Sequence, residues 1–156
     1  MKILFLCTAN SCRSILAEAL FNHLAPSDMR AFSAGSQPRG QVNPLTLQAL
    51  ARAGIAADGL HSKSSDAHQA LSPDFVITVC DKAAGEACPV YFGPAIKAHW
   101  GLCDPSEVVG SPDEVEAAFD ATIVRLKARI GAFLDLPLAQ LDADALRMEL
   151  ARIGTL

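Results

Sequence analysis

The stretch MKILFLCTANSCRS, residues 1–14, passes from an apolar run into a short polar loop that ends in arginine and serine. Residues 2–6 (KILFL) are almost entirely apolar, which is typical of a parallel strand buried on both faces. The loop CTANSCRS, residues 7–14, follows at once and holds two cysteines and one arginine. This order predicts a strand, a tight loop and then a helix.

The composition limits the classes of protein to which the chain can belong. The chain has 156 residues, of which 51% are hydrophobic, and its formal net charge is −4 at pH 7. These values predict one globular domain over residues 1–156 that is long enough to bury a core. The acidic balance argues against a nucleic-acid partner. No apolar run approaches the roughly 20 residues of a membrane span, and the N-terminal run is too short for a secretory signal. We therefore expect a cytoplasmic protein without a membrane partner.

Predicted strands and helices alternate along the whole chain. The predicted strands are residues 2–6, 30–34, 74–80 and 95–100, and the predicted helices are residues 14–24, 44–53, 112–133 and 143–153. Such alternation implies an α/β domain of three layers, with a four-stranded parallel sheet and helices on both of its faces. Residues 137–156 form a C-terminal helical extension of this single domain. In a parallel sheet the functional groups gather at the carboxyl ends of the strands.

Capping residues mark the starts of several predicted helices. Asn43 and Asp142 stand at N-cap positions, and the segment 111–114 (SPDE) has the form of a capping box. In the helix over residues 14–24 the apolar residues share one face, which leaves Glu18 and Asn22 on the outside.

The loop from Cys7 to Ser14 has the features of an anion-binding site. A loop that curls back onto a helix N-terminus directs several backbone N–H groups at one point, which favours an anion. Arg13 can add a bidentate grip on a tetrahedral oxyanion. A Cys7 thiol beside this cradle feels the same positive potential, which favours the nucleophilic thiolate. Asn10 tolerates left-handed backbone, and Ser14 is placed to donate to the thiolate. The predicted oxyanion-binding residues are Thr8, Ala9, Asn10, Ser11, Cys12, Arg13 and Ser14. The alternative is an ordinary turn with a buried cysteine.

The pattern C-x5-R-S after a first strand, with Asn10 and Cys12 inside it, resembles the low-molecular-weight protein tyrosine phosphatases. The resemblance extends from the first strand to the helix that ends near Phe133. It implies that Cys7 is the nucleophile and Arg13 the oxyanion-binding arginine.

The same family carries a late Asp-Pro pair whose carboxyl protonates the leaving group, and HWGLCDPSE supplies Asp104 for this role. An isolated Asp-Pro more often marks a turn. Tyrosine phosphatases resemble one another in having aromatic residues after this pair, whereas Ser106 and Glu107 follow here. This departure weakens the interpretation as a tyrosine phosphatase.

The segment 76–91 (VITVCDKAAGEACPVY) adds two more cysteines. Cys80 ends a predicted strand, so we expect it at the same sheet edge as Cys7. Cys88 follows eight residues later, beyond a stretch of small residues. Hydrolysis of a phosphate ester needs no further thiols. Reduction of an oxyanion needs two electrons, which thiols can supply.

Together, CTANSCRS, VCDKAAGEACP and HWGLCDP are similar to the arsenate reductases built on the phosphatase fold, which serve arsenic detoxification. The resemblance implies a relay in which Cys7 attacks arsenate, Cys80 attacks Cys7 as arsenite leaves, and Cys88 then attacks Cys80. It also implies thioredoxin as the reductant and no tightly bound cofactor, with phosphate and sulfate as competing anions. Some relatives use glutathione or mycothiol with glutaredoxin instead.

Several alternatives stay open for the cysteines. Cys80 could be a core cysteine and Cys88 a loop thiol without a role. Cys80, Cys88, His99 and Cys103 could together bind zinc, although they lack the short spacing of a zinc knuckle. We expect Cys12 and Cys103 to be packing or spectator residues.

The stretch 61–68 (HSKSSDAH), with Ser64 and Asp66, resembles a region that binds potassium behind the loop in some family members. Lys63 stands where it could take the place of that cation. We therefore expect the lysine rather than potassium at this position.

Overall fold

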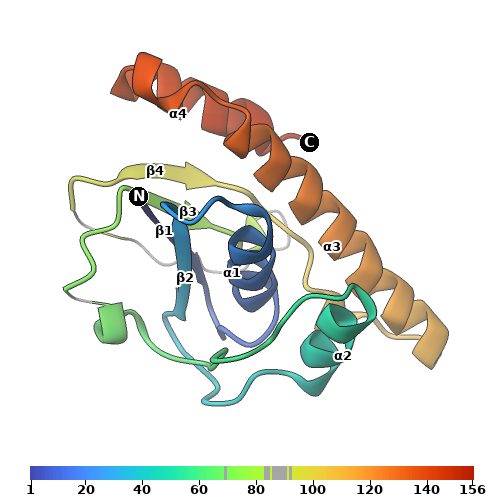
Figure 1. The fold of residues 1–156 in the computed structure, drawn as a ribbon. Helices are drawn as coiled ribbons and strands as arrows, with labels where there is room; N and C mark the ends of the chain where they lie inside the picture. The colour runs from blue at the N-terminus through green and yellow to red at the C-terminus, as the bar shows by residue number, and fades with distance from the viewer. Residues whose placement is uncertain (69, 83–84, 86–90, 92) are drawn as a thin grey trace.

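The computed structural model describes residues 1–156 except 69, 83–84, 86–90 and 92 (Figure 1). In this part of the chain four parallel strands form one sheet in the order β2-β1-β3-β4. The strands are β1 (Lys2–Cys7), β2 (Arg30–Gly35), β3 (Phe75–Thr78) and β4 (Ile96–His99). The predicted four-stranded parallel sheet is confirmed, although β3 and β4 are shorter than expected.

The described α-helices are α1 (Arg13–Leu24), α2 (Pro44–Arg52), α3 (Pro112–Leu134) and α4 (Ala143–Ile153). Each begins within one residue of its predicted start, and in α2, α3 and α4 the reason is that the capping chemistry is local. Asn43 accepts a hydrogen bond from the Leu45 N–H, and Asp142 accepts one from the Ala145 N–H. The capping box at the start of α3 is complete, since Ser111 and Glu114 each accept from the other's backbone N–H.

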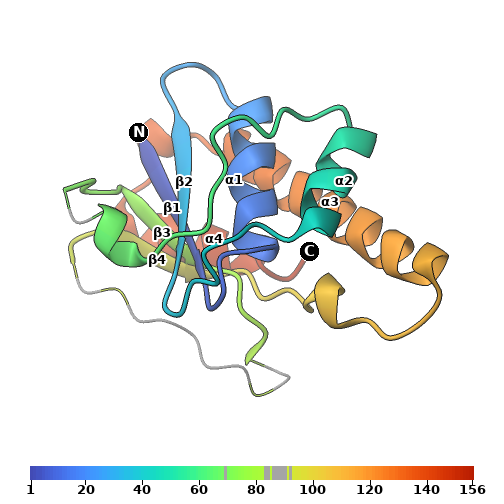
Figure 2. The ribbon, with the colours of Figure 1, turned by 90° about the horizontal axis from the view of Figure 1, so that it is seen from below.

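The two faces of the sheet are covered unequally. Helices α1 to α4 all contribute to the large core on one face, around Phe5 and Ile77. The other face is packed by a smaller cluster around Leu4 and Val76, and the short 3₁₀-helix η1 (Ser65–His68) lies on that side against β2. Figure 2 shows α1, α2 and α3 on one side of the strands and η1 on the other. All four described α-helices thus pack on one face. Among the described residues, the prediction of helices on both faces is met on the second face only by the short helix η1.

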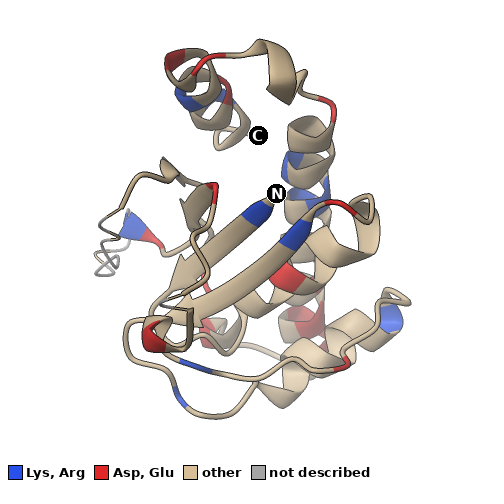
Figure 3. Cartoon of the chain, turned by 60° about the vertical axis from the view of Figure 1, so that its left-hand side comes forward, with Lys and Arg blue, Asp and Glu red and all other residues tan. Residues whose placement is uncertain are grey.

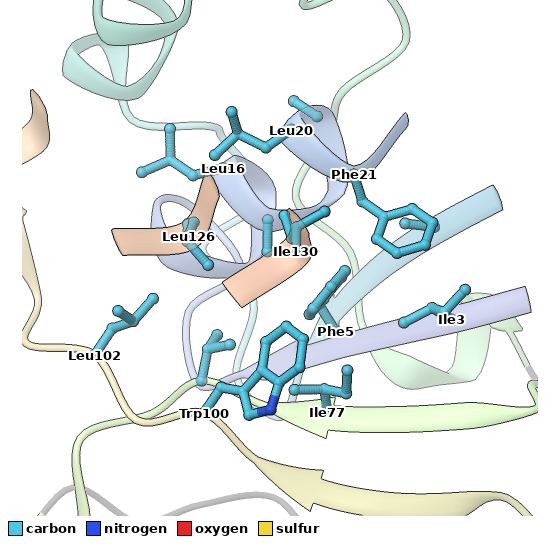
Figure 4. Packing of buried hydrophobic residues seen from close by; sticks show 14 of the residues in the cluster. Ile3, Phe5, Leu16, Leu20, Phe21, Ile77, Trp100, Leu102, Leu126 and Ile130 are labelled. Atoms are coloured by element: carbon cyan, nitrogen blue, oxygen red, sulfur yellow. The ribbon is translucent and has the colours of Figure 1, made fainter. Parts of the chain in front are cut away.

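Aromatic side chains fill the thick side of the core. Trp100 and Phe133 are fully buried, and their ring centroids lie 6.4 Å apart. Phe5 packs 6.2 Å from Trp100 and 6.2 Å from Phe21 (Figure 4). These contacts join β1, α1, α3 and the end of β4 into one unit.

The C-terminal extension belongs to this core. Helix α4 packs on β4, and its Leu146, Leu150 and Ile153 are buried. The indole N–H of Trp100 donates to the carbonyl of Leu150 at 3.0 Å. The extension therefore shields the edge strand of the sheet, a position that otherwise invites unwanted strand pairing.

Charges are spread over the molecule. Figure 3 shows acidic and basic residues interspersed along the chain rather than separated by sign. Among the described residues, no helix is both long and apolar enough to cross a membrane.

Candidate active site

The strand register sets the place of the site. Cys7 is paired with Gly35 of β2, and its neighbour Leu6 is paired with Thr78 of β3. Thr78 is in turn paired with His99 of β4. The carboxyl ends of all four strands therefore meet at one edge, where the loop after Cys7 begins.

The loop turns sharply at Asn10, which has a φ of 47°. Its amide nitrogen Nδ2 donates to Ser14 Oγ at 2.7 Å and to Ser33 Oγ at 3.0 Å. Its Oδ1 accepts from the backbone N–H of Lys63 at 2.9 Å. Asn10 is fully buried, so these bonds satisfy a polar side chain that water does not reach.

Two donors face the sulfur of Cys7. The Asn10 backbone N–H donates to Sγ at 3.3 Å, and Ser14 Oγ lies 2.9 Å from Sγ. Because Ser14 Oγ already accepts from Asn10, its own proton is free to point at the sulfur. These two contacts fix the position of the sulfur that the sequence predicts as the nucleophile.

A second segment holds the loop from outside. The backbone N–H groups of Ser36, Gln37 and Arg39 donate to the carbonyls of Cys7, Thr8 and Ala9 at 3.2, 2.9 and 3.0 Å. Loop carbonyls are thereby occupied outside the site. Helix α1 begins at Arg13 without a side-chain cap, so the amides of its first turn are open to an anion.

Gly35 makes this close packing feasible. A Cβ at this position would overlap the carbonyl oxygen of Thr8 and press on Asn10. The glycine is thus required by the approach of β2 to the loop, not by a left-handed backbone.

Arg13 and Asp104 meet above the loop. Arg13 Nη2 lies 3.5 Å from Asp104 Oδ2, and Nη1 donates to the carbonyl of Leu102 at 3.2 Å. The other carboxylate oxygen of Asp104 accepts from the Ser106 backbone N–H at 2.9 Å and from its hydroxyl at 2.6 Å. The arginine and the acid named from the sequence therefore lie together, although they are far apart along the chain.

These groups line a cavity of about 370 Å³. Its walls include Thr8, Ala9, Arg13 and Asp104, and also four residues that the sequence did not single out for a role in the site: Arg39, Asp81, Gly85 and Glu107. The cavity is large enough for a tetrahedral oxyanion with room for a further reactant.

Cys80 lies beyond the end of β3 and is fully buried. The preceding Val79 N–H donates to the Leu6 carbonyl at 2.9 Å, which holds this part of the chain beside β1. Cys80 is disulfide-bonded in the structure, whereas Cys7, Cys12 and Cys103 are free. Cys88 lies outside the described residues.

Comparison with known proteins agrees with this geometry. A family model for low molecular weight phosphotyrosine protein phosphatase matches residues 2–147. The chain belongs to this family. It is also 33% identical over 133 residues to an arsenate reductase of Shouchella clausii (strain KSM-K16), which covers 85% of this chain and 94% of that protein.

Solved structures give the same picture. An arsenate reductase from Archaeoglobus fulgidus matches with a TM-score of 0.67 and 27% identity, over 83% of this chain and 98% of that one. A thioredoxin-dependent arsenate reductase of Corynebacterium glutamicum matches with a TM-score of 0.56 and 32% identity. The latter alignment covers 83% of this chain and 61% of that one.

The ammonium group of Lys63 lies behind the loop from Cys7 to Ser14. Its Nζ donates to the His61 carbonyl at 2.6 Å and lies 3.4 Å from Ser33 Oγ and 3.7 Å from Glu18 Oε1. Burial lowers the pKa of Lys63, and the charge of Glu18 partly opposes this shift. The ammonium group is one hydrogen-bonding step from Asn10, through Ser33.

The expectation that Glu18 and Asn22 lie on the outside of α1 is wrong. Glu18 accepts from Ser33 Oγ at 2.7 Å, and Asn22 exchanges two hydrogen bonds with the backbone of Ala31. Both side chains turn toward β2. The helix pattern identified their polar face but not the strand beside it.

His99 lies in surroundings that disfavour its charged form. Its Nδ1 is 2.7 Å from Thr78 Oγ1. Burial lowers the pKa of His99, and the charges of Lys82 and Arg129 lower it further, against an opposing effect of Asp81. In the described part of the chain, no group of three or more His, Cys, Asp or Glu side chains is arranged to hold a metal.

Cys12 differs from Cys7 although both lie in the loop. Burial raises the pKa of Cys12 to about 12, and a hydrogen bond with Thr46 lowers it only in part. The thiol therefore stays protonated at neutral pH, in keeping with the prediction that Cys12 is a packing residue.

Substitution of Gly35 tests the close approach of β2 to the loop. Gly35→Ala should weaken the binding of inorganic phosphate at least about tenfold, because the added methyl group displaces the loop amides from their positions. Isothermal titration calorimetry measures this affinity. Gly131→Ala in α3 is the control, since its Cβ meets nothing and should raise the free energy of unfolding by about 0.5–1 kcal/mol. Unchanged phosphate affinity in Gly35→Ala would contradict the packing argument.

Thiol labelling tests the contrast within the loop. At pH 8 iodoacetamide should modify Cys12 far more slowly than the exposed Cys103, because a pKa of about 12 leaves only about one Cys12 in ten thousand as thiolate. Labelling should accelerate as the pH rises toward 12. Peptide mass spectrometry of the folded protein gives the rates, and comparable rates at the two cysteines would refute the assignment.

Proposed function

We propose that this protein is a cytoplasmic arsenate reductase that reduces arsenate to arsenite through a cysteine relay regenerated by thioredoxin. The observation that carries the proposal is a second cysteine, Cys80, just beyond the strand next to the one that ends in Cys7. The arsenate reductases among its relatives support the choice of substrate. Phosphate and sulfate compete, because they are tetrahedral oxyanions of similar shape.

Arsenate binds in the cradle formed by the loop amides and Arg13. The cradle offers N–H donors in an array fixed by Asn10, so little reorganisation accompanies binding. The Cys7 thiolate lies at the base of this cradle. Its Sγ attacks arsenic, an S–As bond forms, and one oxygen leaves as water.

Asp104 supplies the proton for that leaving oxygen. Its Oδ2 faces Arg13, while Oδ1 is held by Ser106, so the carboxyl group has a fixed direction. The position at the cavity wall suits a general acid, which must be within hydrogen-bonding reach of the departing oxygen.

The redox step then follows from the second thiol. Cys80, as thiolate, attacks the sulfur of Cys7, and an S–S bond forms as the S–As bond breaks. The bonding electron pair stays on arsenic, which leaves as arsenite. Two thiols have been oxidised by two electrons and As(V) has been reduced to As(III), so the step balances.

Cys88 completes the relay in this proposal. It attacks Cys80, which releases Cys7 and moves the disulfide to Cys80 and Cys88. Thioredoxin reduces that disulfide by dithiol exchange. A thioredoxin-dependent relative supports this donor, while glutathione with glutaredoxin and mycothiol remain the alternatives. No resident cofactor takes part, and the Lys63 ammonium fulfils the role that potassium has in some relatives.

The second candidate function is hydrolysis of a small phosphate ester. Membership in the phosphatase family and the Cys7, Arg13 and Asp104 arrangement favour it. A tyrosine phosphatase needs a deep aromatic slot, whereas Glu107 lines the cavity at the corresponding place. Residual phosphatase activity is compatible with the reductase, because the first step is shared. A zinc- or arsenic-binding protein is the least supported alternative.

Removal of Cys80 separates the two activities. Cys80→Ser should abolish turnover of arsenate with thioredoxin and thioredoxin reductase, because the S–As adduct on Cys7 then has no attacking thiol. Hydrolysis of an aryl phosphate, if present in the wild type, should persist. The reductase assay follows NADPH consumption, and circular dichroism checks the fold.

The matched control is Cys103→Ser, which alters a free exposed thiol and should leave arsenate turnover unchanged. Arsenate turnover that survives in Cys80→Ser would overturn the relay. Stoichiometric zinc in the purified protein would favour the binding protein instead.

A further inference from the structure

The backbone of Arg39 is anchored to the anion loop, and the residue lines the active-site cavity. Its backbone N–H donates to the Ala9 carbonyl at 3.0 Å. On either side, Gln37 donates to the Thr8 carbonyl at 2.9 Å and Gly40 donates to Ser62 Oγ at 3.1 Å. Three successive anchors over four residues fix where the Arg39 side chain starts, although the residue itself is exposed.

Arg39 lines the same cavity as the anion loop. It lines the cavity together with Thr8, Ala9 and Arg13. The cavity is therefore lined by one arginine from helix α1 and by a second from the segment after β2.

The carboxylates in the cavity wall make a second cation necessary for the binding of an anion. Arg13 is already engaged by the Asp104 carboxylate and the Leu102 carbonyl. Asp81 and Glu107 place two further carboxylates in the cavity wall. A phosphate monoester carries about −1.5 to −2 charges at pH 7, and arsenate is similar. With Arg13 alone, the wall would oppose the entry of such an anion.

Arg39 adds a positive charge to the cavity wall beyond that of Arg13. Arginine stays protonated at any pH the enzyme meets. Within the described residues, no side chain forms a hydrogen bond or an ion pair with its guanidinium group. Its planar fork is therefore available to pair with the outer oxygens of a tetrahedral anion.

We propose that Arg39 is a second oxyanion-binding residue, which captures the substrate dianion at the cavity mouth and sets the affinity of the site for arsenate and its competitors. Its role in turnover rests on the proposed reductase function. Its role in anion binding does not, because the cradle binds phosphate whether or not reduction follows.

The test compares Arg39→Gln with Arg39→Lys, and with Arg30→Gln as the matched control. Arg30 is an exposed arginine at the start of β2, at the opposite end of that strand from the loop. Its substitution changes the net charge equally. The first readout is protection of Cys7 from iodoacetamide by inorganic phosphate, scored on the Cys7 peptide by mass spectrometry because Cys103 also reacts. The second readout is KM and kcat for arsenate.

In Arg39→Gln the phosphate Kd and the arsenate KM should both rise about tenfold, as expected for loss of a charge-assisted hydrogen bond. The kcat should change less than about twofold, and Arg39→Lys should retain most of the affinity. Added salt should raise KM less steeply in Arg39→Gln than in the wild type. Arg30→Gln should match the wild type.

An unchanged phosphate Kd in Arg39→Gln, with the melting temperature preserved, overturns the inference even if arsenate turnover is normal. An equal loss of affinity in Arg30→Gln also overturns it, because bulk charge would then explain the effect. If the wild type shows no arsenate turnover but phosphate protection still depends on Arg39, the proposed function fails and the assignment of Arg39 stands.

Discussion

The hydrogen bonds of Asn10 are the interaction on which the site depends. One side chain in a left-handed turn links Ser14, Ser33 and the Lys63 backbone, and its own backbone N–H faces the Cys7 sulfur. The turn aims the loop amides into the cavity. The side-chain bonds stabilise that turn, because the buried polar partners would otherwise be left unpaired. Cys7 thus acquires its environment from residues as distant in the sequence as Lys63.

The fold supports this loop from two sides. On one side, β1 and α1 are fixed in a core of Phe5, Phe21, Trp100 and Phe133, so the loop between them has rigid ends. On the other side, the segment after β2 follows the loop and binds its carbonyls, which requires glycine at position 35. The same parallel register that ends β1 at Cys7 carries the chain beyond β3 to Cys80. In the proposed relay, this second thiol beyond the next strand is what lets the anion-binding loop take part in redox chemistry.

Local signals in the sequence predicted much of this arrangement. Apolar runs located the strands, and Asn43, Ser111 and Asp142 located helix starts to within a residue, because capping depends on only a few neighbouring residues. The loop motif likewise predicted Arg13 as a site residue, and the Asp-Pro motif predicted Asp104. The two side chains lie beside each other in the structure. These local signals could not predict contacts between segments that are distant in the sequence. Glu18 looked like a solvent-facing helix residue, and only the folded chain shows that Ser33 and Lys63 cover it. Arg39 carries no motif, so its place in the cavity depends wholly on tertiary structure.

A single-turnover reaction without any external reductant decides whether Cys7 and Cys80 act together on arsenate. Fully reduced protein is mixed with excess arsenate, quenched, alkylated and analysed for arsenite and for the state of each cysteine. The account predicts one arsenite per protein molecule and the loss of two thiols, with Cys80 in a disulfide and Cys7 free to be alkylated again. If no arsenite forms, or if it forms while Cys80 remains a free thiol, then the anion loop does not work with Cys80 and the account is contradicted.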